Sequence, residues 1–193
     1  MRLVFATHNK NKAKEVAEVL KDTGWQIVTL EEIGFHDDIV EDGATLEENA
    51  WIKADTIHGL TGENVISDDT GLEVDSLNGI PGVHSARYAG PQRDSNDNMD
   101  KLIDALSKKS DRSAQFRTIV ACIINGGDKL ECEGIVRGTI ATKKTGEGGF
   151  GYDPIFIPEG YSESFAVLDP SIKNSISHRA RAFINCRDLL KSL

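Results

Sequence analysis

Cysteine, aromatic residues and long apolar runs are all scarce in this sequence. The three cysteines (Cys122, Cys132 and Cys186) are widely spaced and form no C-x-x-C pair, which predicts reduced, structural thiols in a cytoplasmic protein. No apolar run approaches the roughly 20 residues that a membrane-spanning helix needs. Residues 1–6 are mostly apolar and stand before a group of lysines, whereas the basic region of a signal peptide precedes its apolar run. We therefore expect neither a membrane span nor a signal peptide.

Positive charge is also in short supply. Lys and Arg number 22 against 31 Asp and Glu, for a formal net charge of −9. This balance argues against nucleic-acid binding, which needs a basic face. It permits a polyanionic small molecule, provided that the few cations gather in one place and a divalent metal is recruited. The 193 residues fit one large domain, or one domain with two lobes, and can bury a core.

Strand and helix patterns alternate along the chain. One expected helix begins at a Thr45/Glu48 capping box and ends at Gly59. Its apolar face consists of Leu46, Ala50, Ala54 and Ile57. Three other helices are expected before Gly24, around residues 99–106 and from about Ser177. Strands are expected at residues 2–6, 25–30, 65–67, 72–77, 115–124, 129–140 and 155–157. Local hairpins together with crossovers predict an α/β fold with a mixed central sheet flanked by helices.

The polar loop at residues 7–12 (THNKNK) lies between the first strand and the first helix. Such a junction offers free backbone N–H groups and the positive end of the helix dipole, which suit phosphate. Thr7 and Asn9 add neutral donors, and Lys12 adds a charge. The alternative is an ordinary helix cap with a solvated, lysine-rich first turn.

A pair of adjacent carboxylates, Asp68 and Asp69, follows the short buried strand expected at residues 65–67. Mg²⁺ takes oxygen ligands and bridges one or two carboxylates to substrate phosphates. On a strand the two side chains point apart, unless a turn redirects one of them. The alternative is an Asp-rich turn. Glu41, in the acidic stretch from Asp37 to Glu48, is a metal-ligand candidate only if the fold brings it to Asp69.

Two later segments could hold a nucleotide base. Glycines around Phe150 in residues 148–154 let the backbone approach a flat ligand on which the ring can stack. The alternative is a glycine-rich turn with a core phenylalanine. Lys173 and the pair His178 and Arg179 could offer hydrogen-bond donors to an acceptor-rich ligand. The alternative is that the His-Arg pair is simply exposed on the surface and has no function.

Four segments together resemble one known family. They are residues 7–12 (THNKNK), 67–90 (SDDTGLEVDSLNGIPGVHSARYAG), 148–158 (GGFGYDPIFIP) and 173–180 (KNSISHRA). Their order and spacing over the whole chain are similar to the inosine triphosphate pyrophosphatase family, also described as HAM1-like, whose bacterial members are XTP/dITP diphosphatases. The resemblance implies a single domain over residues 1–193, elongated and two-lobed, with a nucleotide groove between the lobes. It also implies a homodimer and Mg²⁺.

The resemblance further implies an activity and roles for individual residues. The activity is hydrolysis of non-standard purine nucleoside triphosphates (XTP, ITP, dITP) to the monophosphate and pyrophosphate. Asp69 would be general base and metal ligand with Glu41, and Asp68 would support it. The triphosphate would be held by residues of the first motif and a helix lysine: Thr7, His8, Asn9, Lys10, Asn11, Lys12 and Lys53. The remaining substrate contacts would come from Thr70, Phe150, Gly151, Tyr152, Asp153, Lys173, His178 and Arg179.

One position departs from the family pattern. His8 stands where the family usually has a small residue, so its ring must point away from the phosphates or add a contact of its own. Two other functions fit the same residues: hydrolysis of modified pyrimidine nucleoside triphosphates, and nucleotide sensing without catalysis. The acidic and basic site residues, all present, weigh against the sensor.

Overall fold

The computed structural model describes residues 1–191, apart from the side chain of Asn11. Within these residues a seven-stranded sheet has the order β2-β1-β3-β5-β6-β7, with β4 paired to β3. β1 pairs in parallel with β2 and β3, whereas β3–β4 and β6–β7 are antiparallel. This confirms the predicted α/β class with a mixed sheet. The strands are β1 Arg2–Phe5, β2 Gln26–Thr29, β3 Val65–Val74, β4 Pro81–Gly82, β5 Ser113–Ile124, β6 Asp128–Ile140 and β7 Phe156–Pro158.

The α-helices lie near their predicted positions, with one addition and one shifted end. α2 begins after the Thr45 cap as expected but continues through Gly59, because Gly62 takes the left-handed conformation (φ 67°) that ends a helix. α4 was not predicted from the sequence. The α-helices are α1 Lys10–Leu20, α2 Leu46–Thr61, α3 Ser95–Ala105, α4 Pro170–Ile176 and α5 His178–Lys191.

β3 corrects the prediction of two short strands separated by an aspartate-rich turn. It is one continuous strand that includes Asp68 and Asp69. Its first residues pair with β1 and its last with β4, so backbone hydrogen bonds on both sides of the two aspartates hold the chain extended. Pairing outweighs the local turn propensity of Asp, Thr and Gly. Consecutive β3 side chains therefore alternate between the two faces of the sheet.

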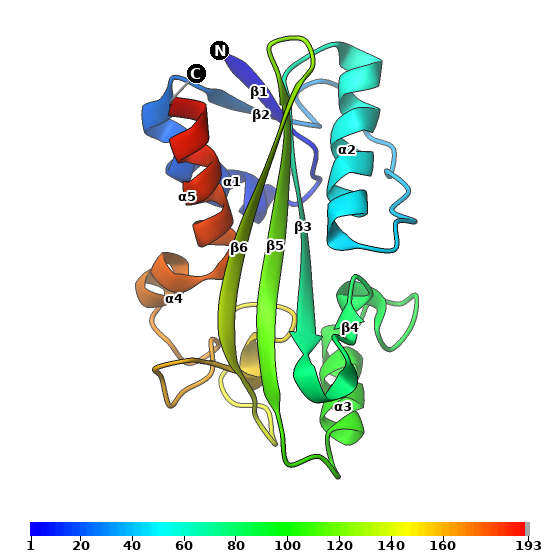
Figure 1. Ribbon diagram of the computed structural model, residues 1–193, viewed down its shortest axis with the longest axis vertical. Helices are drawn as coiled ribbons and strands as arrows, with labels where there is room; N and C mark the ends of the chain where they lie inside the picture. The colour runs from blue at the N-terminus through cyan, green and yellow to red at the C-terminus, as the bar shows by residue number, and fades with distance from the viewer. Residues whose placement is uncertain (192–193) are drawn as a thin grey trace. The chain divides into compact units, whose positions relative to one another are not determined.

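The chain divides into two compact units, and the first comprises Met1–Asp69, Thr118–Gly134 and the segment from Arg179 onward. In this unit α1 and α5 cover one face of the strands and α2 covers the other (Figure 1). The α1/α5 face has an apolar core that includes Leu3, Phe5, Val16, Ile66, Cys122, Phe183 and Cys186. On the opposite face, α2 buries the predicted residues Leu46, Ala50, Ala54 and Ile57.

The second unit comprises Thr70–Arg117 and Ile135–His178 and has its own apolar core. Phe156 is in ring contact with both Phe116 and Phe165, at centroid distances of 4.7 and 5.2 Å. α3 adds Met99 and Leu102 to this core. Each unit is thus organised around a hydrophobic cluster of its own.

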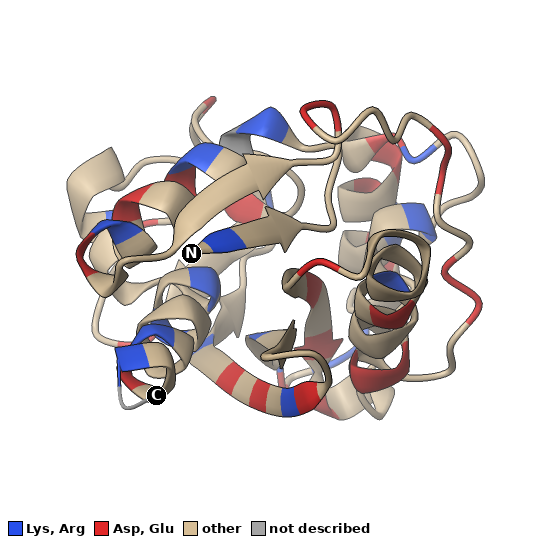
Figure 2. Ribbon diagram, turned by 90° about the horizontal axis from the view of Figure 1, so that it is seen from above, with Lys and Arg blue, Asp and Glu red and all other residues tan. Residues whose placement is uncertain are grey.

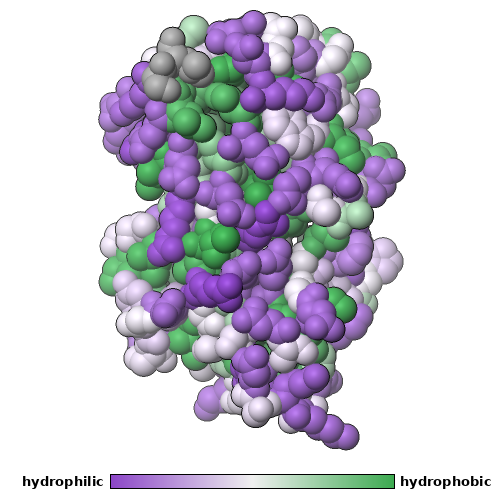
Figure 3. Space-filling view, viewed as in Figure 1, coloured by the Kyte–Doolittle hydropathy of each residue, from purple (hydrophilic) through white to green (hydrophobic). Residues whose placement is uncertain are grey.

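The surface is mixed in charge and mostly polar. Acidic and basic residues are interspersed on the helices (Figure 2). The face seen in Figure 3 is largely hydrophilic, with apolar residues in small patches. None of the described helices is long and apolar enough to cross a membrane. The three cysteines are buried free thiols, as predicted.

Candidate active site

Asp68 and Asp69 lie on opposite faces of β3 in the first unit. Ile66, two residues before Asp68, packs in the core beneath α1 and α5. The Ser67 hydroxyl donates to the Ala50 carbonyl of α2 (2.6 Å), which places Ser67 and Asp69 on the α2 face. The two aspartates therefore have different partners, as strand alternation predicts.

Asp68 is a buried anion held by two cations. Lys12 Nζ donates to both of its carboxylate oxygens, at 3.0 and 2.9 Å, and Arg179 Nε donates to Oδ2 at 3.4 Å. Glu15 accepts from Nη1 of the same guanidinium at 3.3 Å. Burial alone would raise the pKa of Asp68, but Lys12, Arg179 and Lys53 outweigh it and hold that pKa well below its usual range. Asp68 is therefore ionised throughout the neutral range.

Asp69 meets the α2 helix and the loop that carries Glu41. Lys53 Nζ lies 3.4 Å from Asp69 Oδ1 and 2.5 Å from Glu41 Oε2. Asn49 Nδ2 donates to the other oxygen of Asp69, at 3.3 Å. The pKa of Asp69 is raised by burial and by the like charges of Glu41 and Asp68, against the opposing effect of Lys53 and Lys12. A partly buried carboxylate with a raised pKa has the properties of a general base.

Lys53 is the cation that joins two segments far apart in the sequence. Burial would lower its pKa, yet the carboxylates of Asp69 and Glu41 raise it above the ordinary value. The Glu41 and Asp69 carboxylates thus share the Lys53 ammonium as a partner. Its acidic neighbours Asp37, Asp38, Asp42 and Glu48 are exposed, as expected of solvated charges.

The other residues of the 7–12 loop mostly contact the protein itself. Asn9 Oδ1 accepts from the Lys12 N–H (3.2 Å) and caps α1, while Thr7 Oγ1 accepts from the Asn9 N–H (3.2 Å). Lys10 is exposed and pairs with Glu31 at 2.7 Å. The side chain of Asn11 lies outside the described part of the structure.

His8 adds a contact of its own. Its Nε2 lies 3.0 Å from the Asp37 carbonyl oxygen, and its ring stacks near Phe35 with centroids 6.2 Å apart. The ring is therefore engaged by the loop at residues 35–37. The bulky side chain of His8 is thus accommodated by contacts within the protein.

In the second unit, Asp153 organises the glycine-rich segment around Phe150. Its buried carboxylate accepts from the Phe150 N–H (2.7 Å) and from Lys173 Nζ (2.6 Å). Lys173 Nζ also lies 5.1 Å from the centroid of the Phe150 ring, whose residue is 55% exposed. Gly149 has φ +75°, and a Cβ there would collide with the Asp153 carboxylate. Phe150 is thus a fixed but accessible aromatic surface.

The remaining predicted residues of this unit are less accessible. The buried Tyr152 hydroxyl donates to the Ser85 carbonyl at 2.8 Å. His178 is buried and stacks on Phe116, with centroids 4.6 Å apart. Gly151 adopts a positive φ of 64°, and Thr70 is half-buried on β3. Tyr152 and His178 are thus held within the packed interior of this unit.

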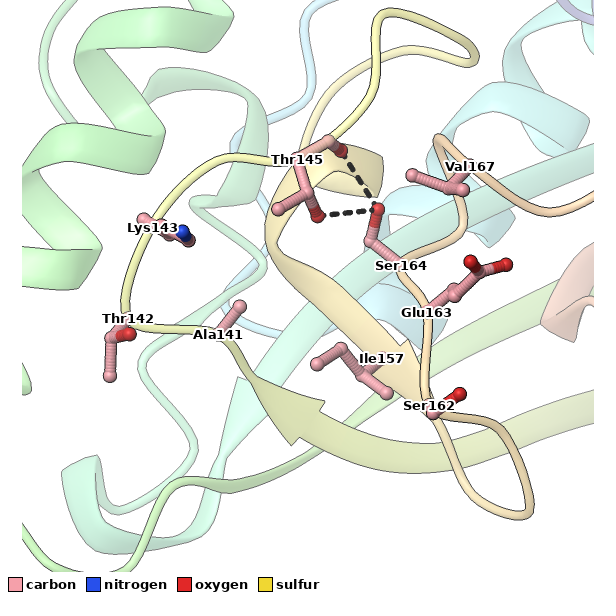
Figure 4. A pocket seen from close by; sticks show the side chains of 9 residues that line it. All are labelled: Ala141, Thr142, Lys143, Thr145, Ile157, Ser162, Glu163, Ser164 and Val167. Carbon is pink, nitrogen blue, oxygen red and sulfur yellow. Dashed lines mark hydrogen bonds between the residues drawn. The ribbon is translucent and has the colours of Figure 1, made fainter.

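A separate hollow of about 370 Å³ in the second unit contains none of the predicted residues. Figure 4 shows two of its lining residues, Thr145 and Ser164, hydrogen-bonded to each other: the Ser164 hydroxyl donates to the Thr145 carbonyl (2.8 Å) and accepts from Thr145 Oγ1 (3.1 Å). These hydroxyls tie two loops together. The hollow is lined by Ala141, Thr142, Lys143, Thr145, Ile157, Ser162, Glu163, Ser164 and Val167.

Comparison with known proteins places the chain in a family. The model of the Ham1 family matches residues 3–189. The chain belongs to the Ham1 family. It is 47% identical over 190 residues to a dITP/XTP pyrophosphatase of Flavobacterium johnsoniae, covering 98% of each chain. It is 44% identical to the dITP/XTP pyrophosphatase of Bacillus subtilis, covering 98% of this chain and 96% of that one.

Solved structures of Ham1 proteins share the fold. A HAM1 protein from Coxiella burnetii is 38% identical and superposes with a TM-score of 0.94 over 100% of both chains. The Ham1 protein of Staphylococcus aureus is 35% identical, with a TM-score of 0.92 over 100% of this chain and 99% of that one. The family indicated by the four segments and the predicted fold class are both confirmed.

Two residues of this Ham1 chain's site were missed from the sequence: Glu15 and Asn49. Glu15 is one of several charged residues on α1, and nothing local marks it as the partner of Arg179. Asn49 did leave a signal, since it stands with Lys53 among the buried positions of α2, where apolar residues are expected. A polar residue on the buried face of a helix indicates a specific partner.

The carboxylates of this site suit a metal ion that takes only one or two ligands from the protein, as Mg²⁺ does, rather than one held by protein ligands alone. Among the described side chains, no three His, Cys, Asp or Glu groups are placed to hold a metal ion by themselves. Mg²⁺ commonly uses one or two carboxylates and takes its other ligands from water and phosphate. Glu41 and Asp69, held beside one ammonium group, offer such a pair. The cluster has more carboxylates than cations: Glu15, Glu41, Asp68 and Asp69 against Lys12, Lys53 and Arg179.

Proposed function

We propose that this chain hydrolyses non-standard purine nucleoside triphosphates, namely XTP, ITP and dITP, to the monophosphate and pyrophosphate. One observation carries the proposal: Glu41 and Asp69, from distant segments, meet at the buried ammonium of Lys53. Adjacent to Asp69 on β3, Asp68 holds Lys12 and Arg179. The names of the Ham1 relatives as dITP/XTP pyrophosphatases support the same activity.

In this proposal Asp69 orients a water molecule and takes its proton as the water attacks the α-phosphorus. Attack is in line with the departing pyrophosphate. The raised pKa of Asp69 favours proton acceptance. Lys53 fixes one oxygen of that carboxylate, and Lys12 would face the developing negative charge while Asp68 holds it in place. The backbone and side chains of residues 7–12 are proposed to hold the triphosphate.

The metal is proposed to be Mg²⁺, held by Glu41 and Asp69. A triphosphate brings further negative charge to a cluster that already has more carboxylates than cations, so a divalent cation is needed to offset the repulsion. Bound Mg²⁺ would neutralise charge on the phosphate oxygens and on the leaving pyrophosphate.

The purine base of the substrate is proposed to be recognised by stacking and by hydrogen bonds. Phe150 would stack on it, and His178, Arg179 and nearby backbone N–H groups would donate hydrogen bonds to the 6-oxo group of hypoxanthine or xanthine. Adenine carries a 6-amino donor there, and a buried polar mismatch of that kind discriminates strongly. Thr70, Gly151, Tyr152, Asp153 and Lys173 are proposed to complete the substrate contacts or to hold them in place.

Replacing Phe150 by alanine should weaken nucleotide binding without affecting the fold. Loss of aromatic stacking costs about 1–3 kcal/mol per base, so KM for ITP should rise by roughly 5- to 150-fold. Stability should hold because the residue is 55% exposed. Steady-state kinetics and thermal unfolding measure the two effects. Tyr161→Ala, at another exposed aromatic of the same unit, is the matched control and should leave KM unchanged; an unchanged KM in Phe150→Ala contradicts the stacking role.

Pyrophosphate release from XTP, ITP, GTP and ATP, each with Mg²⁺ and with EDTA, tests the whole proposal. We expect rapid release from XTP and ITP, slow release from GTP and ATP, and none in EDTA. Guanine shares the 6-oxo group, so its rejection must come from the 2-amino position. Equal rates on GTP and XTP would overturn the specificity, and rates indifferent to EDTA would overturn the metal. Adding modified pyrimidine triphosphates tests the rival hydrolase. Tight nucleotide binding with no pyrophosphate release would identify a sensor.

Two further properties are proposed from the resemblance and the composition. The chain is proposed to form a homodimer, which light scattering of the purified protein would establish. It is proposed to act in the cytoplasm, because its three cysteines are buried free thiols and the cytoplasm is a reducing compartment.

A further inference from the structure

Asn49 connects the Asp69 carboxylate to the loop that carries Glu41, through opposite ends of its amide. Its Oδ1 accepts from the Gly43 N–H at 2.9 Å, and its Nδ2 donates to Asp69 Oδ2 at 3.3 Å. Gly43 lies two residues after Glu41, on the same loop. Asn49 itself is only 1% exposed, so its amide has no access to bulk water.

The hydrogen bonds fix which way the amide faces. A backbone N–H can only donate, so the group that faces Gly43 must be the amide oxygen. The NH₂ group then necessarily faces Asp69. Lys53, one turn later on α2, contacts the other oxygen of the same carboxylate at 3.4 Å. α2 therefore presents one neutral and one charged donor to the two oxygens of Asp69.

Gly43 is part of the same arrangement. A Cβ at this position would lie 2.7 Å from Asn49 Oδ1 and 2.7 Å from Glu48 Cβ, too close for real atoms. Its backbone does not adopt a positive φ, so the close approach to Asn49 is the reason that glycine is required here. The loop that carries Glu41 is thus seated directly on the Asn49 amide.

We infer that Asn49 is a positioning residue that sets the orientation of the Asp69 carboxylate and, through Gly43, the place of the Glu41 loop. The inference rests on the proposed role of Asp69 as the base and of Glu41 as its metal partner. A misplacement of about 1 Å at a reacting group can cost 10²-fold in rate. Asn49 thus acts through its two neighbours and touches neither substrate nor metal.

The principal test replaces Asn49 by alanine and compares it with a matched control. Asn98, on α3 of the second unit, is also buried (4% exposed); its amide accepts from the Ala89 N–H and donates to the Ala86 carbonyl, at 2.6 and 3.1 Å. Asn49→Ala should lower kcat for ITP by about 10- to 100-fold with little change in KM. Asn98→Ala should lower Tm without lowering kcat. Equal kcat losses in the two variants would show a merely structural role and overturn the inference.

Two further variants keep the test decisive if Asn49→Ala does not fold. Asn49→Asp is isosteric and keeps an acceptor for the Gly43 N–H, but it turns an anion toward Asp69, so kcat should fall at least as far. Gly43→Ala leaves the Asn49 side chain chemically unchanged, but the added Cβ would push its amide aside. This variant should lower kcat to an intermediate degree. Wild-type kcat in both variants would overturn the inference.

Calorimetric titration of Mg²⁺, with α,β-methylene-ITP present, gives a readout that needs no turnover. Asn49→Ala should weaken Mg²⁺ binding by about 10- to 100-fold, as is typical when a partner of a metal ligand is removed. Asn98→Ala should bind Mg²⁺ as tightly as the wild-type protein does. If Asn49→Ala also binds Mg²⁺ with wild-type affinity, Asn49 does not position Glu41. If the wild-type protein releases no pyrophosphate, the proposed function fails, while this titration still decides the role of Asn49.

Discussion

Replacing Asp69 by asparagine is expected to lower kcat for ITP and XTP by about 10²–10⁴-fold, the usual effect of removing a general base. The variant keeps the shape of the side chain but can no longer take a proton. Because Asp69 is less deeply embedded than Asp68 (15% against 1% side-chain exposure), the fold should persist. Initial rates of pyrophosphate release measure the loss, and calorimetry with α,β-methylene-ITP shows whether the nucleotide still binds.

Glu73→Gln is the matched control for Asp69→Asn. Glu73 is another partly buried carboxylate of β3, and it contacts Gln115 and Arg117 rather than any predicted site residue. Its neutralisation should leave kcat at the wild-type level. An Asp69→Asn variant that turns over at a near-normal rate would rule out Asp69 as the base, whatever its effect on binding.

Replacing Asp68 by asparagine should destabilise the protein by about 3–5 kcal/mol, because removing one partner of a buried ion pair leaves the other charge uncompensated. Here the charges left behind are Lys12 and Arg179, whose side chains are 19% and 7% exposed. Urea unfolding followed by the fluorescence of the buried Trp25 measures the change. Activity should fall as well, since Lys12 would lose its anchor.

Glu31→Gln provides the comparison for Asp68→Asn. It breaks the exposed pair with Lys10, whose two side chains are 76% and 63% exposed, and should leave the unfolding free energy unchanged. If Asp68→Asn were as stable as Glu31→Gln, the buried cluster would not contribute to folding as its geometry indicates.

The depressed pKa of Asp68 also predicts how stability responds to acid. A carboxylate with a lower pKa in the folded state adds stability that is complete above its unfolded-state pKa of about 3.9 and is lost as the pH falls toward the folded-state pKa. Below about pH 4 the wild-type unfolding free energy should therefore decrease more steeply with acidification than that of Asp68→Asn. Parallel curves for the two proteins would contradict this.

Much of the fold could be predicted from local sequence patterns. The α2 helix was located by its Thr45 cap and its apolar face, and the two long strands β5 and β6 by their composition and the turn between them. Residues 65–77 could not be placed correctly, because Asp, Thr and Gly favour turns locally whereas pairing with β1 and β4 keeps β3 extended. That pairing involves partners far away in the sequence, which no local pattern contains.

By itself the sequence indicated the family and a set of candidate site residues, since motif order and spacing are properties of the chain alone. Only the tertiary structure decided how the two adjacent aspartates divide their roles. Because β3 is extended through both, Asp68 points to Lys12 and Arg179, 56 and 111 residues away in the sequence, and is fixed as a buried anion. Asp69 points to α2, where Lys53 and Asn49 hold it beside Glu41 with a raised pKa. Burial and charge partners set those pKa values, and both arise from contacts between distant segments.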